Sequence, residues 1–383
     1  MSSVIPAPIA RQPWSMLTPL ILLTCFGAAV LYSAAGGSFT PFASSHLIRF
    51  GIFMVVALVI AAMPRDFVKL VAYPAYVGIL LLLVAVEAAG AMGGGSQRWL
   101  EVGPIRLQPS ELMKPAIALA LARFYDTLPT GMIGSWRALV PAGVIIALPV
   151  GLVLMQPDLG TALAILFSGA VVMFLAGLPM SWFLSAGAAG AIAVPLAYNF
   201  ALKPYQQRRV TTFLDPESDP LGAGYHITQS KIALGSGGFS GKGFLNGTQS
   251  HLNFLPEKQT DFIFTMLAEE FGMIGGLSLL LIYAVIIIYG FVIALRVRNQ
   301  FGRLVALGLI GNFFLYIFIN IAMVMGLLPI VGIPLPLVSY GGTAMLSIMI
   351  GFGFIICANV HREVRVGRHG RNDGGEGRRI LKG

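Results

Sequence analysis

The sequence has 383 residues, of which 56% are hydrophobic and 11% are charged. Water-soluble domains carry about 25% charged residues, so this composition excludes an ordinary soluble globule and also a disordered chain. The net charge is +9, but seven of the 25 lysines and arginines lie from residue 361 onward, which favours a tail beside anionic lipid over a nucleic-acid site.

The apolar residues form ten blocks, each about as long as a helix that crosses a ~30 Å hydrocarbon core. The blocks are 15–34, 46–63, 69–88, 110–125, 138–155, 161–178, 180–199, 263–295, 304–325 and 342–359. We therefore expect an all-α polytopic membrane protein with about ten transmembrane helices. The eighth block is long for one crossing, so we expect it to be tilted or to begin outside the bilayer.

The short loops predict the orientation, because lysine and arginine collect in cytoplasmic loops. With both termini in the cytoplasm, fifteen of the 25 cations lie on the inner side. The long segment 200–262, between spans seven and eight, then lies outside the membrane. It includes the amphipathic stretch 225–234, which predicts a short interfacial helix. The chain thus divides into an N-terminus (1–14), a membrane domain (15–362) and a basic tail (363–383).

Cations gather in the segment 97–116, QRWLEVGPIRLQPSELMKPA, at the outer ends of spans three and four. Glu111 and Lys114 are three residues apart and therefore share one helix face within the membrane. A bare ion pair there is costly. Either the pair joins two helices, or Arg98, Arg106 and Lys114 line a polar cavity that receives an anionic headgroup.

Two further charged residues lie at membrane depth on the same side. Asp158, in MQPDLGTAL, follows Pro157 at a helix break, which either lines a cavity or is a turn in which Asp158 caps the next helix. Arg49 lies near the outer end of span two, where the cost of a buried arginine favours a functional role.

The glycine-rich segment 235–247, GSGGFSGKGFLNG, resembles a phosphate-binding loop only superficially. A Walker A motif needs glycine six residues before its lysine and serine or threonine after it. Ser236 and Gly243 occupy those positions around Lys242, so we expect a flexible or tightly turned loop instead.

The segment 253–272 carries Glu257, Lys258, Thr260 and Asp261 just before a new apolar block, at the outer mouth of the membrane. An acid at this boundary is partly desolvated, which raises its pKa toward that of a useful general base. The alternative is that Thr260 or Asp261 caps the following helix.

The segment 329–345, PIVGIPLPLVSYGGTAM, joins spans nine and ten on the outer side. It either shapes a groove in which Ser339 and Tyr340 donate hydrogen bonds, or it is only a rigid loop. Cations, candidate bases and a long loop thus gather on one face, a pattern that suits a membrane-anchored phosphate-bearing lipid handled from outside.

At these motifs the sequence closely resembles the SEDS family (shape, elongation, division and sporulation). The similarity covers about residues 15–362 and is carried by 97–116, QPDLGTAL, GTQSHLNFLPEKQTDFIFTMLAEEFG and GIPLPLVSYGG. It implies a peptidoglycan glycosyltransferase of the bacterial cytoplasmic (inner) membrane that polymerises lipid II on the outer face during cell elongation. The implied partners are a class B penicillin-binding protein and other proteins of the elongation complex. In the family the acid at the position of Asp261 is essential.

The implied reaction assigns roles to the candidate residues. The anomeric carbon inverts, undecaprenyl pyrophosphate leaves, and Asp261 is expected to be the general base. Cations must offset the charge that builds on the pyrophosphate. The candidates for this are Arg49, Arg98, Lys114, and Arg208 or Arg209. The other predicted substrate-site residues are Arg106, Glu111, Asp158, Glu257, Lys258, Thr260 and Ser339. The sequence contains no legible metal-ligand set, although a divalent cation could share the charge, and no other cofactor is implied.

Two rival functions are consistent with the same sequence. A lipid II flippase would use the same cations and cavity but would need no base at Asp261. A non-catalytic scaffold for the penicillin-binding protein would tolerate substitutions in the cavity but not on its lipid-facing surfaces.

Overall fold

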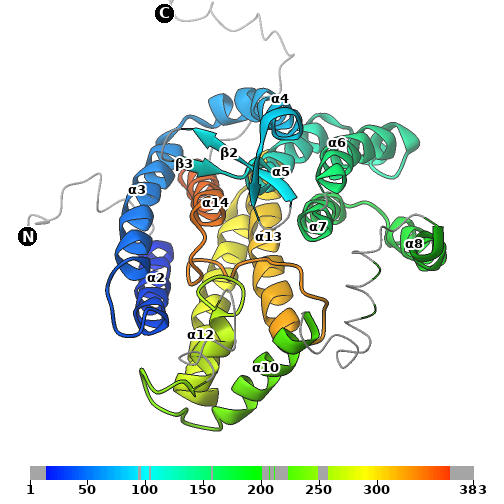
Figure 1. Cartoon of the computed structure of the whole chain (residues 1–383). Helices are drawn as coiled ribbons and strands as arrows, with labels where there is room; N and C mark the ends of the chain where they lie inside the picture. Colours follow the sequence, from blue (N-terminus) through cyan, green and yellow to red (C-terminus); the bar gives the residue numbers. More distant parts are fainter. Residues whose placement is uncertain are drawn as a thin grey trace, which may run out of the picture.

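The computed structural model describes residues 14–93, 96–102, 105–156, 158–200, 207, 211, 223–248 and 258–362. Each of the ten predicted blocks corresponds to one helix, and Figure 1 shows how these helices are arranged. The helices are α2 (Trp14–Ala34), α3 (Phe42–Ala62), α4 (Arg65–Ala89), α5 (Pro109–Thr127), α6 (Trp136–Met155), α7 (Leu159–Leu175), α8 (Met180–Phe200), α12 (Ile263–Arg296), α13 (Gln300–Val324) and α14 (Gly342–Val360).

Eight of these helices are long and apolar enough to cross a membrane. The other two are α7, which is shorter at 17 residues, and α5, whose sequence includes two acidic and two basic residues. The prediction of an all-α polytopic membrane protein is confirmed, whereas the count of ten crossings stays a prediction.

Smaller elements lie on the connections. Between α4 and α5 the chain forms three short antiparallel strands in the order β1 (Ala91–Gly93), β2 (Ser96–Val102) and β3 (Ile105–Leu107). These strands were not expected from the apolar pattern. The predicted helix at 225–234 is confirmed as α10 (Ala223–Ser236), and a short 3₁₀ turn, η1 (Thr130–Met132), precedes α6.

The helices differ in how much of their surface lies inside the protein. Three quarters of the apolar stretch of α13 and of α14 lies inside the bundle (72% in each case), and α5 is buried almost throughout. By contrast, α8 lies to one side of the bundle (Figure 1), and none of its described residues is buried.

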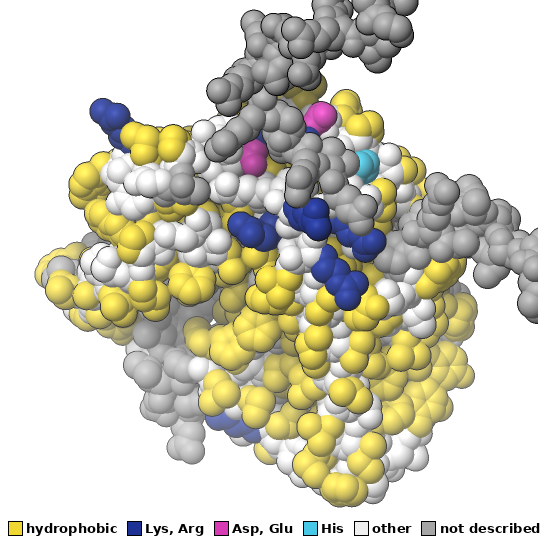
Figure 2. All heavy atoms as spheres, turned by 180° about the vertical axis from the view of Figure 1, so that it is seen from behind, with side chains coloured by type: hydrophobic (Ala, Val, Ile, Leu, Met, Phe, Trp, Pro, Cys, Tyr) yellow, Lys and Arg dark blue, Asp and Glu magenta, His cyan; other side chains and the backbone are white. Residues whose placement is uncertain are grey.

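The outer surface of the bundle is also apolar. Figure 2 shows hydrophobic side chains over most of the face seen from behind, with a group of lysine and arginine side chains in its upper part and a few others at its edges. Leu81 and Leu281 are among the large apolar residues that are well exposed. Apolar surface of this extent is typical of helices that face lipid.

The helix α12 is broken at Gly272, whose backbone angles (φ 64°, ψ −158°) are not helical. The break divides the 34-residue element into a short segment, 263–271, which we call the outer segment after its predicted side of the membrane, and a longer segment, 273–296. The longer segment alone is about 36 Å long at 1.5 Å per residue, enough to cross a ~30 Å core. The break therefore accounts for the unusual length of the eighth apolar block.

Replacing Gly272 with alanine is expected to lower the melting temperature of the detergent-solubilised protein. Its backbone conformation is essentially restricted to glycine and costs other residues about 1–3 kcal/mol. A Cβ there would also clash with the backbone of Gly241. Gly276→Ala is the matched control, because the nearest atom to its Cβ would be Phe264 Cζ at 3.7 Å, an ordinary contact. Equal melting temperatures for the two variants would contradict the strain argument.

Candidate active site

Several of the predicted site residues lie around the connection between α13 and α14, which we call the proline-rich loop (residues 329–341). This loop donates hydrogen bonds to backbone carbonyls of the turn at 258–262, which lies just before α12. Ser339 Oγ donates a hydrogen bond to the carbonyl of Thr260 at 2.5 Å, and the Tyr340 amide donates to the carbonyl of Gln259 at 2.8 Å. Ser339 Oγ also accepts from the Leu335 amide at 2.7 Å. Ser339 therefore links this turn to the proline-rich loop by hydrogen bonds.

Asp261 lies half-buried in the same turn. Asn320 Nδ2, from α13, donates to the carbonyl of Asp261 at 2.9 Å and to that of Ile333 at 2.7 Å, so one side chain ties the turn to the loop. The carboxylate faces Gly332, where an added Cβ would lie 3.4 Å from Asp261 Oδ2. Gly332 has φ +74°, a backbone conformation that favours glycine.

The helix-capping alternative for this turn is not supported. The helix α12 begins at Ile263, and its N-cap position is taken by Phe262, which has no polar side chain to cap it. The partial burial that the sequence predicted at this boundary is present. Burial also lowers the pKa of Lys258, in the same turn, below its usual value.

The break before α7 brings a second acid to the loop. Asp158 caps α7 through Thr161, whose amide and hydroxyl donate to its carboxylate at 3.1 and 2.8 Å. Its Oδ2 also lies 3.5 Å from Arg98 Nε on β2. The next turn approaches the loop so closely that a Cβ at Gly160 would lie 2.7 Å from the carbonyl oxygen of Val331, the neighbour of Gly332. The capping alternative for Asp158 is thus correct, and the residue also lies beside the candidate site.

Arg49 approaches the loop from α3. Its guanidinium lies over the ring of Tyr340, 4.8 Å from the ring centroid. The same ring packs edge-on against Phe42. Arg49 is half-buried, so a cation is held beside the residue whose backbone binds the turn at 258–262.

Glu111 and Lys114 form a cluster with Tyr316 in the interior. Lys114 Nζ lies 2.6 Å from Glu111 Oε1 and 2.6 Å from the Tyr316 hydroxyl, which in turn donates to Glu111 Oε2. Ser347 Oγ, from α14, donates to the Glu111 carbonyl at 2.7 Å. The Lys114 side chain has no exposed surface. These contacts favour the interpretation of the pair as a link between helices, because a headgroup does not reach Lys114 in this conformation.

The remaining predicted residues lie further out or outside the described part of the chain. Arg106, on β3, pairs with Glu101 of β2 at 2.9 Å, with both side chains largely exposed. Arg208, Arg209 and Glu257 lie outside the described residues. Among the described residues, no group of three or more His, Cys, Asp or Glu side chains is placed so that it could hold a metal ion.

Two residues of the site were not predicted from the sequence. Tyr316 and Asn320 are one turn apart on α13, so the interior cluster and the turn at 258–262 both bind the same face of one helix. The signal was present, because polar side chains spaced four residues apart in an apolar block mark a face turned toward protein rather than lipid.

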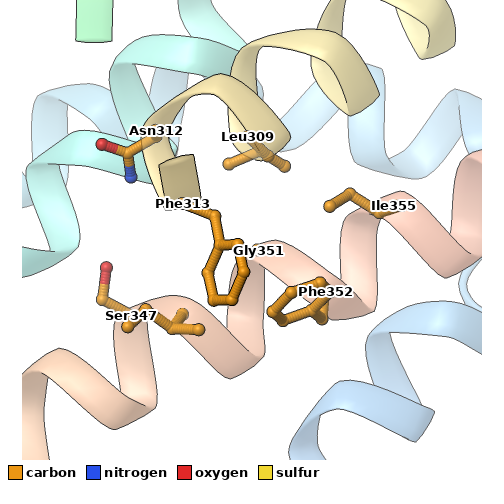
Figure 3. A pocket seen from close by; sticks show the side chains of 8 residues that line it. Leu309, Asn312, Phe313, Ser347, Gly351, Phe352 and Ile355 are labelled. Atoms are coloured by element: carbon orange, nitrogen blue, oxygen red, sulfur yellow. The ribbon is translucent and has the colours of Figure 1, made fainter. Parts of the chain in front are cut away.

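A small cavity lies between α13 and α14 (Figure 3), but it does not supply a phosphate site. Asn312 and Ser347 are the polar side chains of its lining, and the rest of the lining is apolar. No charged side chain lines it. The candidate site is therefore the region around the proline-rich loop.

The fold and this site define a multi-pass membrane protein with an acid and several cations at one end of its helical bundle. The family model for FtsW, RodA and SpoVE, described as cell cycle protein, matches residues 13–365. The chain therefore belongs to this family, the SEDS family that its motifs indicated.

Relatives and solved structures agree with the family. The chain is 46% identical over 354 residues to the peptidoglycan glycosyltransferase MrdB of Escherichia coli (strain K12), covering 91% of this chain and 94% of that protein. A solved peptidoglycan synthase complex, described as coordinating polymerization and crosslinking, contains a chain with 30% identity and a TM-score of 0.81, covering 92% of this chain and 99% of that one. The rod shape determining protein RodA of Thermus thermophilus has 26% identity and a TM-score of 0.71, covering 93% and 99%.

Proposed function

We propose that this protein is a peptidoglycan glycosyltransferase that polymerises lipid II on the outer face of the cytoplasmic membrane during cell elongation. The observation that carries the proposal is the placement of Asp261. Its backbone is tied to the proline-rich loop by Asn320, and its half-buried carboxylate lies beside Gly332 of that loop. The names of the relatives support the same activity.

In this reaction the 4-hydroxyl of the acceptor sugar attacks C1 of the donor. Asp261 takes the proton of that hydroxyl as the new C–O bond forms, because the neutral hydroxyl is a weak nucleophile. The bond from C1 to the pyrophosphate oxygen breaks on the opposite face with its electron pair, so the anomeric carbon inverts and undecaprenyl pyrophosphate leaves.

Cations around the proline-rich loop offset the charge that builds on the leaving pyrophosphate. Arg49 and Arg98 are held there by Tyr340 and Asp158. Lys258 lies in the turn that carries Asp261, and its lowered pKa brings its loss of charge closer to neutral pH than for an exposed lysine. A divalent cation bound beside the pyrophosphate would share this role with the arginines, and no other cofactor is proposed.

The solved synthase complex supports a partner that crosslinks the glycan product, for which a class B penicillin-binding protein is proposed, alongside other proteins of the elongation complex. The proposed topology has both termini in the cytoplasm, with the turn at 258–262 outside, because the cations of the short loops lie mostly on the inner side.

The decisive experiment mixes the detergent-solubilised protein and its penicillin-binding partner with labelled lipid II and separates the products by size. Glycan chains of many disaccharides are expected, and the partner alone should produce none. In detergent there are no two leaflets to cross, so a flippase or a scaffold would leave lipid II unchanged, and that outcome would overturn the proposal.

A further inference from the structure

The glycine-rich loop (residues 235–247) is built into the break in α12. In an unbroken helix the amides of Met273 and Ile274 would donate to the carbonyls of Glu269 and Glu270. Here those two carbonyls accept instead from the amides of Lys242 and Gly243, each at 3.0 Å. The two amides donate to the carbonyls of Gly238 and Phe239 at 3.0 and 3.2 Å. The loop thus provides hydrogen-bond partners for the two carbonyls before the break and for the two amides after it.

Glycines make this close contact possible. Gly241 has φ +80°, and a Cβ there would clash with the carbonyl of Glu270. A Cβ at Gly237 would clash with the carbonyl of Ala268. The glycines that resembled a phosphate-binding loop are therefore explained by close backbone packing against α12.

The side chain of Lys242 joins the loop to the outer segment of α12. Its ammonium lies 2.7 Å from Glu269 Oε1 and 2.7 Å from Thr248 Oγ1. Glu269 has no exposed surface, whereas the Lys242 side chain is 27% exposed. The neighbouring Glu270 accepts a hydrogen bond from Ser33 of α2. Both glutamates at this end of the segment therefore have partners on other elements.

The outer segment, 263–271, is a short helix. Asp261 lies just before its first residue, and the contact between Lys242 and Glu269 lies near its other end. Its residues 263–270 are all buried. Near Asp261 two contacts fix this segment. Asn320 donates a hydrogen bond to the Asp261 carbonyl, and the Thr265 hydroxyl lies 2.8 Å from that of Ser230 on α10. A packed helix moves largely as one unit, so a shift at the Glu269 end of this segment is carried to the end beside Asp261.

We infer that the glycine-rich loop sets the position of Asp261, with Lys242 and Glu269 as positioning residues for the glycosyl transfer. This inference rests on the proposed function. Neither residue touches the substrate in this scheme, so both act through the placement of the outer segment relative to the proline-rich loop.

The test measures kcat and KM for lipid II, and the melting temperature, of four variants in complex with the partner. Lys242→Met is expected to lower kcat about 10- to 100-fold, since a misplacement of about 1 Å costs up to about 100-fold. KM should stay within about twofold, because only the geometry of the transition state is affected. Lys242→Arg should retain most of the activity, since it keeps the charge beside Glu269.

The double variant Lys242→Met/Glu269→Gln separates positioning from stability. It leaves no unpaired buried charge, so its melting temperature should return to near that of the wild type while its kcat stays low. Lys231→Met, on the neighbouring helix α10, is the matched control, since Lys231 makes no ion pair with a described carboxylate. It should behave as the wild type.

Three results would overturn the inference. They are a wild-type kcat for Lys242→Met, a wild-type kcat for the double variant, and a raised KM with unchanged kcat, which would make Lys242 a substrate-binding residue. If Lys242→Met does not fold, the double variant decides alone. A wild-type protein that makes no polymer would overturn the proposed function instead, so the two failures are distinguishable.

Discussion

Asp261→Asn is expected to reduce glycan polymerisation from labelled lipid II by about 10²- to 10⁴-fold, the usual contribution of a general base. Asparagine keeps the size of the side chain, and the hydrogen bond from Asn320 goes to the backbone carbonyl, so the turn should be retained. The loss should therefore appear in kcat, with the melting temperature unchanged.

Asp66→Asn provides the matched control for this substitution. Asp66 is 85% exposed at the opposite end of the bundle, where it pairs with Arg65. Exposed ion pairs contribute little to stability, so the control should polymerise as the wild type does. Polymer from Asp261→Asn at near wild-type rates would remove the assignment of the base and would favour a site that uses substrate or solvent groups instead.

Lys114→Met is expected to cause the largest loss of stability among single substitutions in the interior cluster. It leaves the Glu111 carboxylate buried without its cation, and breaking a buried pair in this way costs about 3–5 kcal/mol. The double variant Lys114→Met/Glu111→Gln removes both charges and should recover much of that loss. Thermal unfolding in detergent measures both.

The same variants decide between the two interpretations of the pair. If the pair only joins helices, polymerisation by the double variant should recover together with stability. If Lys114 binds the pyrophosphate, stability should recover while KM for lipid II stays raised. Lys69→Met is the control, since the Lys69 side chain is 34% exposed and Asp126 keeps a hydrogen bond from the Phe301 amide, so its loss of stability should be smaller than that of Lys114→Met.

The positions of the helices were largely predictable, because each crossing must be a long apolar block. The first and last residues of the helices were less predictable, because a helix can continue past the apolar core of the membrane. The helix α3 begins at Phe42 and α4 at Arg65, four residues before the predicted blocks in both cases. The β2–β3 hairpin and the break at Gly272 depend on backbone geometry that the hydropathy of the sequence does not record.

The candidate site was predicted as a set of residues but not as an arrangement. Charged side chains at membrane depth are few, so Arg98, Asp158 and Asp261 stood out from composition alone. Their meeting around the proline-rich loop depends on contacts between segments far apart in the chain, such as Asn320 with Asp261. The sequence did not decide whether Lys114 is buried, because a cation at that depth can face either a cavity or a partner helix.

The break in α12 also bears on how the chain enters the bilayer. The segment 273–296 carries no charged residue before Arg296, so it can insert as an ordinary apolar helix as soon as it is synthesised. Both glutamates lie in the outer segment, and their partners Ser33 and Lys242 belong to parts of the chain that are made earlier. The chain thereby keeps the apolar residues that cross the bilayer apart from the acidic residues that need earlier-made partners.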